Sequence, residues 1–221
     1  MEIFHSTFRW IHIAFGMASI ILFWIPAFSK KGGKLHRESG KLYVKAMAVV
    51  VLTAAILSIR LLAVGEYYTG LFLGFLSLIT ANPLFAGWAI LRPKEWHQKV
   101  YLIIGLTIGL YGLVMVYFAT QLPTGNGILF YFFGGIGVFS AWGPLKGFIK
   151  KQTVTAAKMP THVSGMLFSG GAAYTAFFAF GARAYISEIF VGWWQILPWV
   201  LPTLLAGLAA SLYRRKYLAG S

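Results

Sequence analysis

The sequence contains neither cysteine nor aspartate. Without cysteine, a disulfide framework, a thiolate metal site and a cysteine nucleophile are excluded. Without aspartate, a Ser–His–Asp triad is excluded. The only carboxylate side chains are Glu2, Glu38, Glu66, Glu95 and Glu188. Acid–base or metal chemistry must therefore draw on these five groups, the five histidines and the hydroxyl side chains.

Charge is also scarce. Charged residues make up 11% of the 221 residues, whereas hydrophobic residues make up 58%. A compact soluble protein of this composition would expose apolar patches larger than soluble monomers tolerate. The net charge is +14, and the basic residues that produce it are grouped in short segments between apolar runs. Nucleic-acid binding, which needs a basic face, is therefore not expected. The composition predicts a polytopic protein surrounded by the lipid bilayer.

Seven apolar runs are long enough for a helix to cross the hydrocarbon, which takes about 20 residues. None shows the short alternating pattern of a β-barrel strand. We therefore predict an all-α fold, in which residues 1–221 form a single domain built as a bundle of seven transmembrane helices. The predicted spans are residues 10–28, 42–64, 67–91, 100–122, 127–148, 161–185 and 193–213.

The basic residues predict the orientation. With seven spans, 16 of the 19 Lys and Arg residues fall on one side of the membrane, and only Arg9, Arg60 and Arg183 fall on the other. The positive-inside rule makes the basic side cytoplasmic, so the N-terminus is expected outside and the C-terminus inside. On that side the basic residues are expected to contact anionic lipid headgroups. We therefore expect a multi-pass protein of a cytoplasmic (inner) membrane.

Glycines gather in the fifth and sixth spans and allow helix backbones to approach closely. They are Gly134, Gly135, Gly137, Gly165, Gly170 and Gly171. Such faces serve packing inside the chain or contact within a homodimer, and the sequence does not decide between them.

Three histidines fall on the predicted cytoplasmic side, in three different connections. They are His36, His97 and His162, and Met166 follows His162 by one helical turn. Three histidines with an open fourth position are typical of catalytic zinc, with Glu95 or Glu38 as the base. Two histidines from different helices are typical of haem b, with methionine as a substitute ligand. The alternative is that these histidines only face water or headgroups.

His12 lies inside the first predicted span. An ionisable group there costs free energy and marks either a function or a satisfied internal contact. We therefore consider a cofactor ligand or proton relay, and equally a hydrogen bond to a Tyr or Thr of a neighbouring helix.

Short motifs resemble a family of uncharacterised bacterial multi-span membrane proteins, defined as a domain of unknown function. The first span carries His12-x-x-x-Gly16, and the second begins with His36-Arg37-x-x-Gly40-x-x-Tyr43. A later span contains a further histidine. The resemblance implies a bacterial cytoplasmic-membrane protein and implies no settled activity. A looser similarity to small b-type membrane cytochromes is weakened because this chain lacks matched pairs of deep histidines on two facing helices.

Three functional hypotheses follow. The first is a metal or haem site near the cytoplasmic face, lined by His36, His97 and His162 with Met166 as auxiliary ligand, used in redox chemistry or cofactor handling. In that hypothesis His12 binds at a second, outer site. The second is a zinc-dependent membrane hydrolase that uses the same three histidines. The third is a non-enzymatic transporter or assembly factor with structural histidines.

Overall fold

The computed structural model describes residues 2–92, 94–122, 127–149 and 158–218, and these form helices joined by short turns, with no strand among them. Seven of the helices are long and apolar enough to cross a membrane, as predicted. They are α1 (Glu2–Phe28), α2 (Lys34–Ala63), α3 (Tyr67–Ala89), α4 (Glu95–Ala119), α5 (Gly127–Ile149), α6 (Lys158–Ala176) and α8 (Leu197–Leu218). The short helix α7 (Arg183–Ile186) lies between the last two.

The helix ends differ from the predicted spans for identifiable reasons. Both α1 and α2 start eight residues before the predicted spans, because an apolar run marks the hydrocarbon crossing rather than the whole helix. The predicted sixth span, 161–185, is interrupted: a π-helical turn at Phe177–Gly181 follows α6 and closes with a 2.7 Å bond from the Ala182 N–H to the Phe177 carbonyl. Helix α8 begins only after a 3₁₀ turn at Gly192–Ile196, and Pro198 occupies its first turn, a position where proline is favoured.

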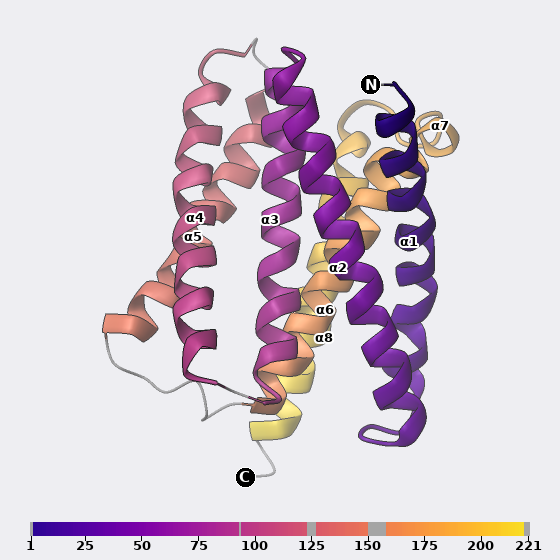
Figure 1. Cartoon of the computed structure of the whole chain (residues 1–221), viewed down its shortest axis with the longest axis vertical. Helices are drawn as coiled ribbons and strands as arrows, with labels where there is room; N and C mark the ends of the chain where they lie inside the picture. Colours follow the sequence, from indigo (N-terminus) through magenta and orange to yellow (C-terminus); the bar gives the residue numbers. More distant parts are fainter. Residues whose placement is uncertain (1, 93, 123–126, 150–157, 219–221) are drawn as a thin grey trace.

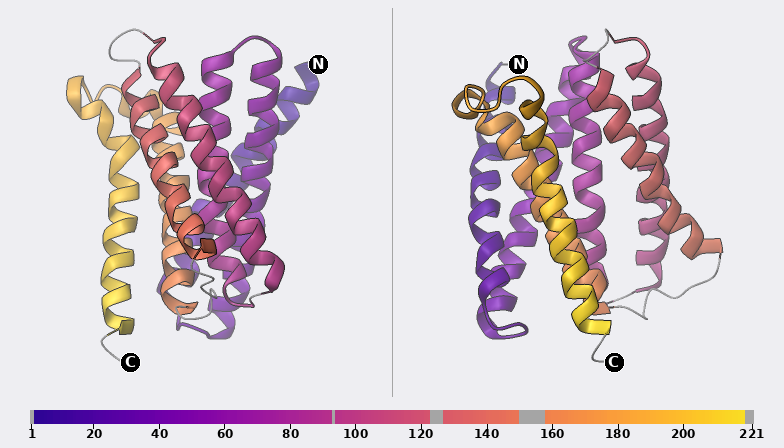
Figure 2. Two further views of the ribbon diagram at one scale, coloured as in Figure 1. Left: turned by 90° about the vertical axis from the view of Figure 1, so that its left-hand side faces the viewer. Right: turned by 180° about the vertical axis from the view of Figure 1, so that it is seen from behind.

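Helix α3 is the centre of the bundle. It packs against α2, α4 and α6, whereas α1 pairs mainly with α2, α5 with α4, and α8 with α6 (Figures 1 and 2). The start of α1 and the end of α8 lie at opposite ends of the bundle (Figure 1).

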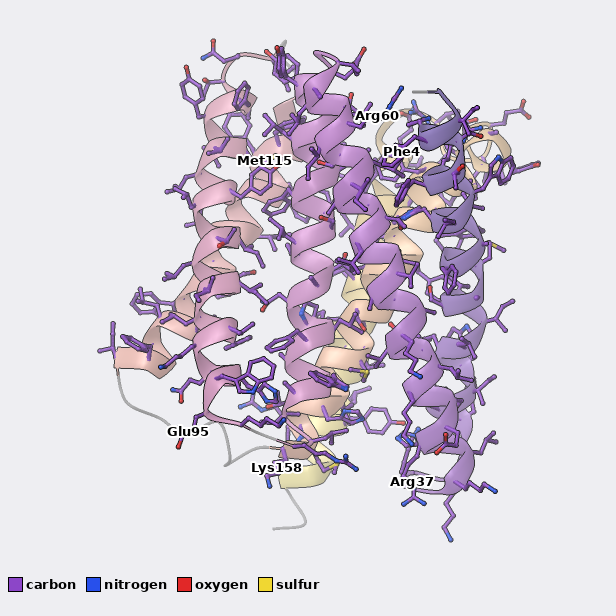
Figure 3. The ribbon with its side chains drawn as sticks, viewed as in Figure 1. Phe4, Arg37, Arg60, Glu95, Met115 and Lys158 are labelled. Carbon is purple, nitrogen blue, oxygen red and sulfur yellow. The ribbon has the colours of Figure 1, made fainter. Side chains whose placement is uncertain are left out.

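The end of the bundle near the C-terminus is the basic end. Arg37 and Lys158 lie there, whereas Arg60 lies at the opposite end (Figure 3). This agrees with the charge distribution predicted for seven spans. The assignment of the basic end to the cytoplasm stays a prediction from the positive-inside rule.

The largest buried cluster joins α3, α4 and α5 in the half of the bundle away from the basic end, where Figure 3 shows Met115. Phe75, Ile108 and Met115 are fully buried there. On the outside of the bundle large apolar side chains remain exposed, such as Phe139 at 79% and Leu110 at 66%. Such a surface is suited to lipid.

Most of the predicted glycine contacts are made inside the chain. A Cβ added to Gly165 would stand 2.5 Å from the Pro83 carbonyl oxygen and 2.6 Å from the Gly87 Cα, so α3 and α6 touch here through their backbones. Gly134 and Gly171 meet α4 and α8 in the same way, whereas Gly135 faces open space. These contacts account for five of the six glycines without a second copy of the chain. A homodimer stays a prediction.

We expect the substitution Gly165→Ala to destabilise the protein by about 1–3 kcal/mol, because the added methyl group meets backbone atoms that cannot rotate away. The substitution Gly135→Ala is the matched control. It adds the same group within a helix where nothing lies within 4 Å, so its effect should be neutral or slightly stabilising. Thermal unfolding in detergent measures both variants, and equal melting temperatures would contradict the close α3–α6 contact.

Candidate functional site

Two of the three predicted ligands come together at the basic end. His36 lies in the first turn of α2 and His162 lies near the start of α6. Their ring centroids are 6.4 Å apart, with 70° between the ring planes. Both helices start at the basic end and run in the same direction (Figure 1), so each presents its early residues to the other.

Both rings are held through Nδ1. His36 Nδ1 lies 3.0 Å from the Pro26 carbonyl oxygen, and His162 Nδ1 lies 2.8 Å from the Gly87 carbonyl oxygen. A carbonyl oxygen can only accept, so each Nδ1 carries the proton and donates it. In neutral imidazole the lone pair is then on Nε2. This is the arrangement that orients histidine for metal binding, with the second nitrogen donating to a backbone carbonyl.

The two carbonyls are available because helices end there. Pro26 lies in the last turn of α1 and Gly87 in the last turn of α3, where carbonyls lack an N–H partner four residues further on. Lys31 also donates to the Pro26 carbonyl, at 3.0 Å, and burial lowers the pKa of its ammonium group. The histidines thus complete two helix ends that the chain leaves open.

A second polar contact joins α2 to α6 two turns further into the bundle. Tyr43 and Ser169 follow His36 and His162 by seven residues each, and their oxygens are 2.8 Å apart. Ser169 already donates to the Met166 carbonyl, so the Tyr43 hydroxyl is the donor. Both side chains are buried, at 2% and 0% exposure. Sequence analysis missed this pair, although the seven-residue spacing after each histidine was a usable signal.

Aromatic side chains and Met166 close this region towards the membrane interior. The Phe23 ring of α1 lies 5.8 Å from the Tyr43 ring, and the Trp24 indole donates to the Tyr174 hydroxyl at 2.5 Å. Met166 packs against the buried cluster that contains Tyr43. A Cβ added to Gly87 would stand 2.7 Å from the Met166 methyl group. The thioether side chain therefore lies beside the residue that anchors His162.

His97 has a different role. Its Nδ1 accepts the backbone N–H of Lys94, the N-cap residue of α4, at 3.1 Å. The proton of neutral His97 is then on Nε2, which is buried without a hydrogen-bond partner among the described atoms. The ring packs against Phe85, Trp88 and Trp96. Neither nitrogen offers a lone pair. The structure gives no support to the prediction that His97 is a ligand.

His12 also stands apart from the pair. Its Nδ1 lies 3.1 Å from the Val50 carbonyl oxygen and 3.0 Å from the Thr53 hydroxyl, both on α2. Thr53 in turn donates to the Val49 carbonyl at 2.7 Å. This is the satisfied internal contact that the sequence offered as one alternative, with a threonine as partner.

The two carboxylates considered as bases do not face the pair. Glu38 lies two residues after His36 and forms an ion pair with Lys41 at 2.9 Å, with 58% of its side chain exposed. Glu95 is exposed at the start of α4 and points outward (Figure 3). Within the described ranges, no three His, Asp or Glu side chains are grouped closely enough to hold a metal ion. The arrangement required of a zinc hydrolase is therefore not assembled by these residues.

Comparisons of the chain with protein-family models, with curated proteins and with solved structures found no match.

Proposed function

We propose that this chain is an integral membrane protein that binds a transition metal through Nε2 of His36 and His162, for redox chemistry or cofactor handling near the cytoplasmic face. The observation that carries the proposal is the shared anchoring of the two rings. Each Nδ1 donates to a backbone carbonyl at 3.0 Å or less, and the ring centroids are 6.4 Å apart. If each histidine served only to cap a helix end, the two rings would not need to lie next to each other.

The ligand set favours copper(I) or haem iron over zinc. It offers two neutral nitrogens, with the Met166 thioether one helical turn from His162 and no carboxylate facing the pair. Soft thioether and imidazole ligands suit copper(I), and His with His or Met suits haem iron. Catalytic zinc sites take three protein ligands.

Two measurements on the detergent-purified chain test the proposal. The first is the visible spectrum, oxidised and then reduced with dithionite, in which haem gives a Soret band that shifts on reduction. The second is a copper(I) titration against a chromophoric chelator under anaerobic conditions. We expect one haem or one copper ion per chain. A colourless protein that also fails to compete with the chelator for copper(I) would contradict the proposal and leave the histidines with a structural role.

A further inference from the structure

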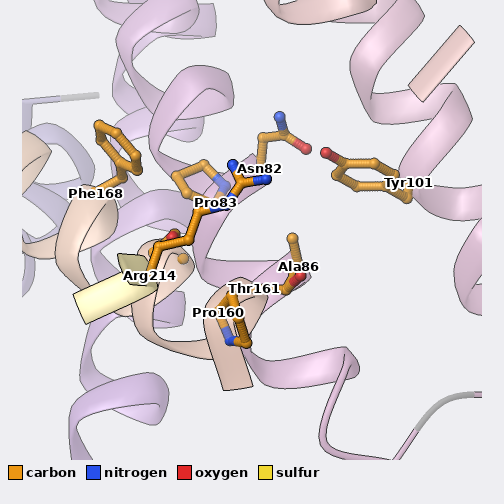
Figure 4. A pocket seen from close by; sticks show the side chains of 10 residues that line it. Asn82, Pro83, Ala86, Tyr101, Pro160, Thr161, Phe168 and Arg214 are labelled. Atoms are coloured by element: carbon orange, nitrogen blue, oxygen red, sulfur yellow. The ribbon is translucent and has the colours of Figure 1, made fainter. Parts of the chain in front are cut away.

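A cavity of about 350 Å³ lies between α3, α4, α6 and α8 at the basic end. This volume is within the range of small-molecule sites. Its polar lining residues come from all four helices: Asn82, Tyr101, Thr161, Ser164 and Arg214 (Figure 4). On α6, Thr161 and Ser164 belong to the face next to that of His162, whose ring turns towards α2 and α3. The cavity is therefore distinct from the histidine pair.

The cavity has a positive side. The Arg214 side chain extends from α8 towards Asn82 and Pro83 (Figure 4). No acidic residue lines the cavity, and among the described side chains Arg214 forms no ion pair. The first turn of α6 contributes Pro160 and Thr161 to the wall, and the start of a helix favours a negative charge. An anion in the cavity would thus meet a guanidinium group and a helix start together.

A second feature of the cavity is a side chain that lacks a hydrogen-bond donor. The Asn82 side-chain oxygen is buried and has no hydrogen-bond partner among the described atoms. It points towards the Tyr101 hydroxyl, without a hydrogen bond between them (Figure 4). A buried acceptor without a donor is destabilising, so such groups are normally satisfied by protein, water or ligand. A ligand hydroxyl or ammonium group placed between these two side chains would supply the missing donor.

We propose that this cavity binds the anionic headgroup of a phosphate ester that also carries a hydrogen-bond donor. The phosphate pairs with Arg214, and the donor reaches the Asn82 oxygen. A glycerophospholipid of the inner leaflet and a free soluble phosphate share this chemistry. The site does not depend on metal binding by His36 and His162.

The test measures binding of three probes to the delipidated full chain in detergent: monomeric short-chain phosphatidylglycerol, its phosphatidylmethanol analogue and inorganic phosphate. The variant is Arg214→Gln. Its matched control is Arg215→Gln, which removes the same charge from the next residue, exposed and outside the cavity lining. We expect Arg214→Gln to weaken phosphatidylglycerol binding about tenfold or more, as for the loss of a charged hydrogen bond. Both arginines are exposed, but only Arg214 lines the cavity. Arg215→Gln should therefore leave the affinity within about twofold.

The donor is tested by the ligand pair. Phosphatidylmethanol has the same charge and lacks the glycerol hydroxyls, so we expect it to bind about fivefold more weakly, as for the loss of one neutral hydrogen bond. This preference should disappear in Asn82→Ala. Displacement of the lipid by inorganic phosphate would support the site and identify a free anion as a sufficient ligand, whereas binding of the lipid alone would support it as a headgroup site. Equal losses in Arg214→Gln and Arg215→Gln, or no binding of any probe, would overturn the proposal.

Discussion

Replacement of His162 by alanine is expected to weaken binding of copper(I) or haem by at least about a hundredfold, since losing a direct ligand should exceed the tenfold to hundredfold cost of losing an outer-shell partner. His36→Ala should have a similar effect. The double variant should lose little more, because each single variant already breaks the two-ligand arrangement. Chelator competition for copper(I), or the Soret band for haem, measures all three.

His97→Ala is the control for this prediction. His97 is a buried histidine at the same end of the bundle, but its Nδ1 accepts a backbone N–H and its Nε2 carries the proton. Its loss should lower the melting temperature through the helix cap and leave metal affinity within about threefold, well short of an outer-shell loss. Equal losses of affinity in His97→Ala and His162→Ala would show that the pair is not the binding site.

Replacement of Phe75 by alanine should have the largest effect on stability, a loss of about 3 kcal/mol. The ring is fully buried between α3, α4 and α5, 5.8 Å from the Tyr111 ring. A Cβ added to Gly137 would stand 2.7 Å from it. We place the loss at the low end of the range for buried phenylalanine. In a bilayer the side chain is also surrounded by apolar groups in the unfolded state, so the loss of stability comes mainly from lost packing contacts and little from exposure to water.

Phe139→Ala is the matched control for Phe75→Ala. Phe139 lies two residues beyond Gly137 on α5 and is 79% exposed on the outside of the bundle. It therefore loses little packing on truncation, and we expect its melting temperature in detergent to stay close to that of the wild type. A comparable loss in both variants would contradict the buried position of Phe75.

The sequence was sufficient for the number of helices long and apolar enough to cross a membrane, and for the charge difference between the two ends, but not for the short helix α7. Both depend on the distribution of apolar and basic residues along the chain, because long apolar runs form the helices that cross a bilayer and basic residues lie between them. The break after α6 was not predicted, because the Phe177–Gly181 segment is as apolar as a continuous helix. Its π-helical turn ends in the hydrogen bond from the Ala182 N–H to the Phe177 carbonyl, and a change in backbone hydrogen bonding of this kind is not visible in hydropathy.

The candidate site was predictable only in part. The position of His36, His97 and His162 on one side followed from the basic residues, but their partners depend on how each helix is rotated. His36 and His162 lie next to each other because the face of α2 that carries His36 is turned towards the face of α6 that carries His162. Tyr43 and Ser169, two turns further along the same two faces, are in contact for the same reason. The role of His97 had a local signal, since a side chain three residues after an N-cap can accept its backbone N–H. The cavity at Arg214 is formed by residues of four helices, so no pattern within the sequence of a single helix predicts it.

The placement of α6 against α2 and α3 has a consequence for biosynthesis. Most helix contacts join helices that are neighbours along the chain, and these contacts can form as soon as both helices have been synthesised. The α3–α6 and α1–α6 contacts can form only after α6 has been synthesised. His162 is residue 162 of 221, and Ser169 follows it. Until they emerge, the Tyr43 hydroxyl and the Gly87 carbonyl have no partner in the nascent bundle. We therefore expect a nascent α1–α5 intermediate in which these two polar groups lack their final partners until α6 has been translated.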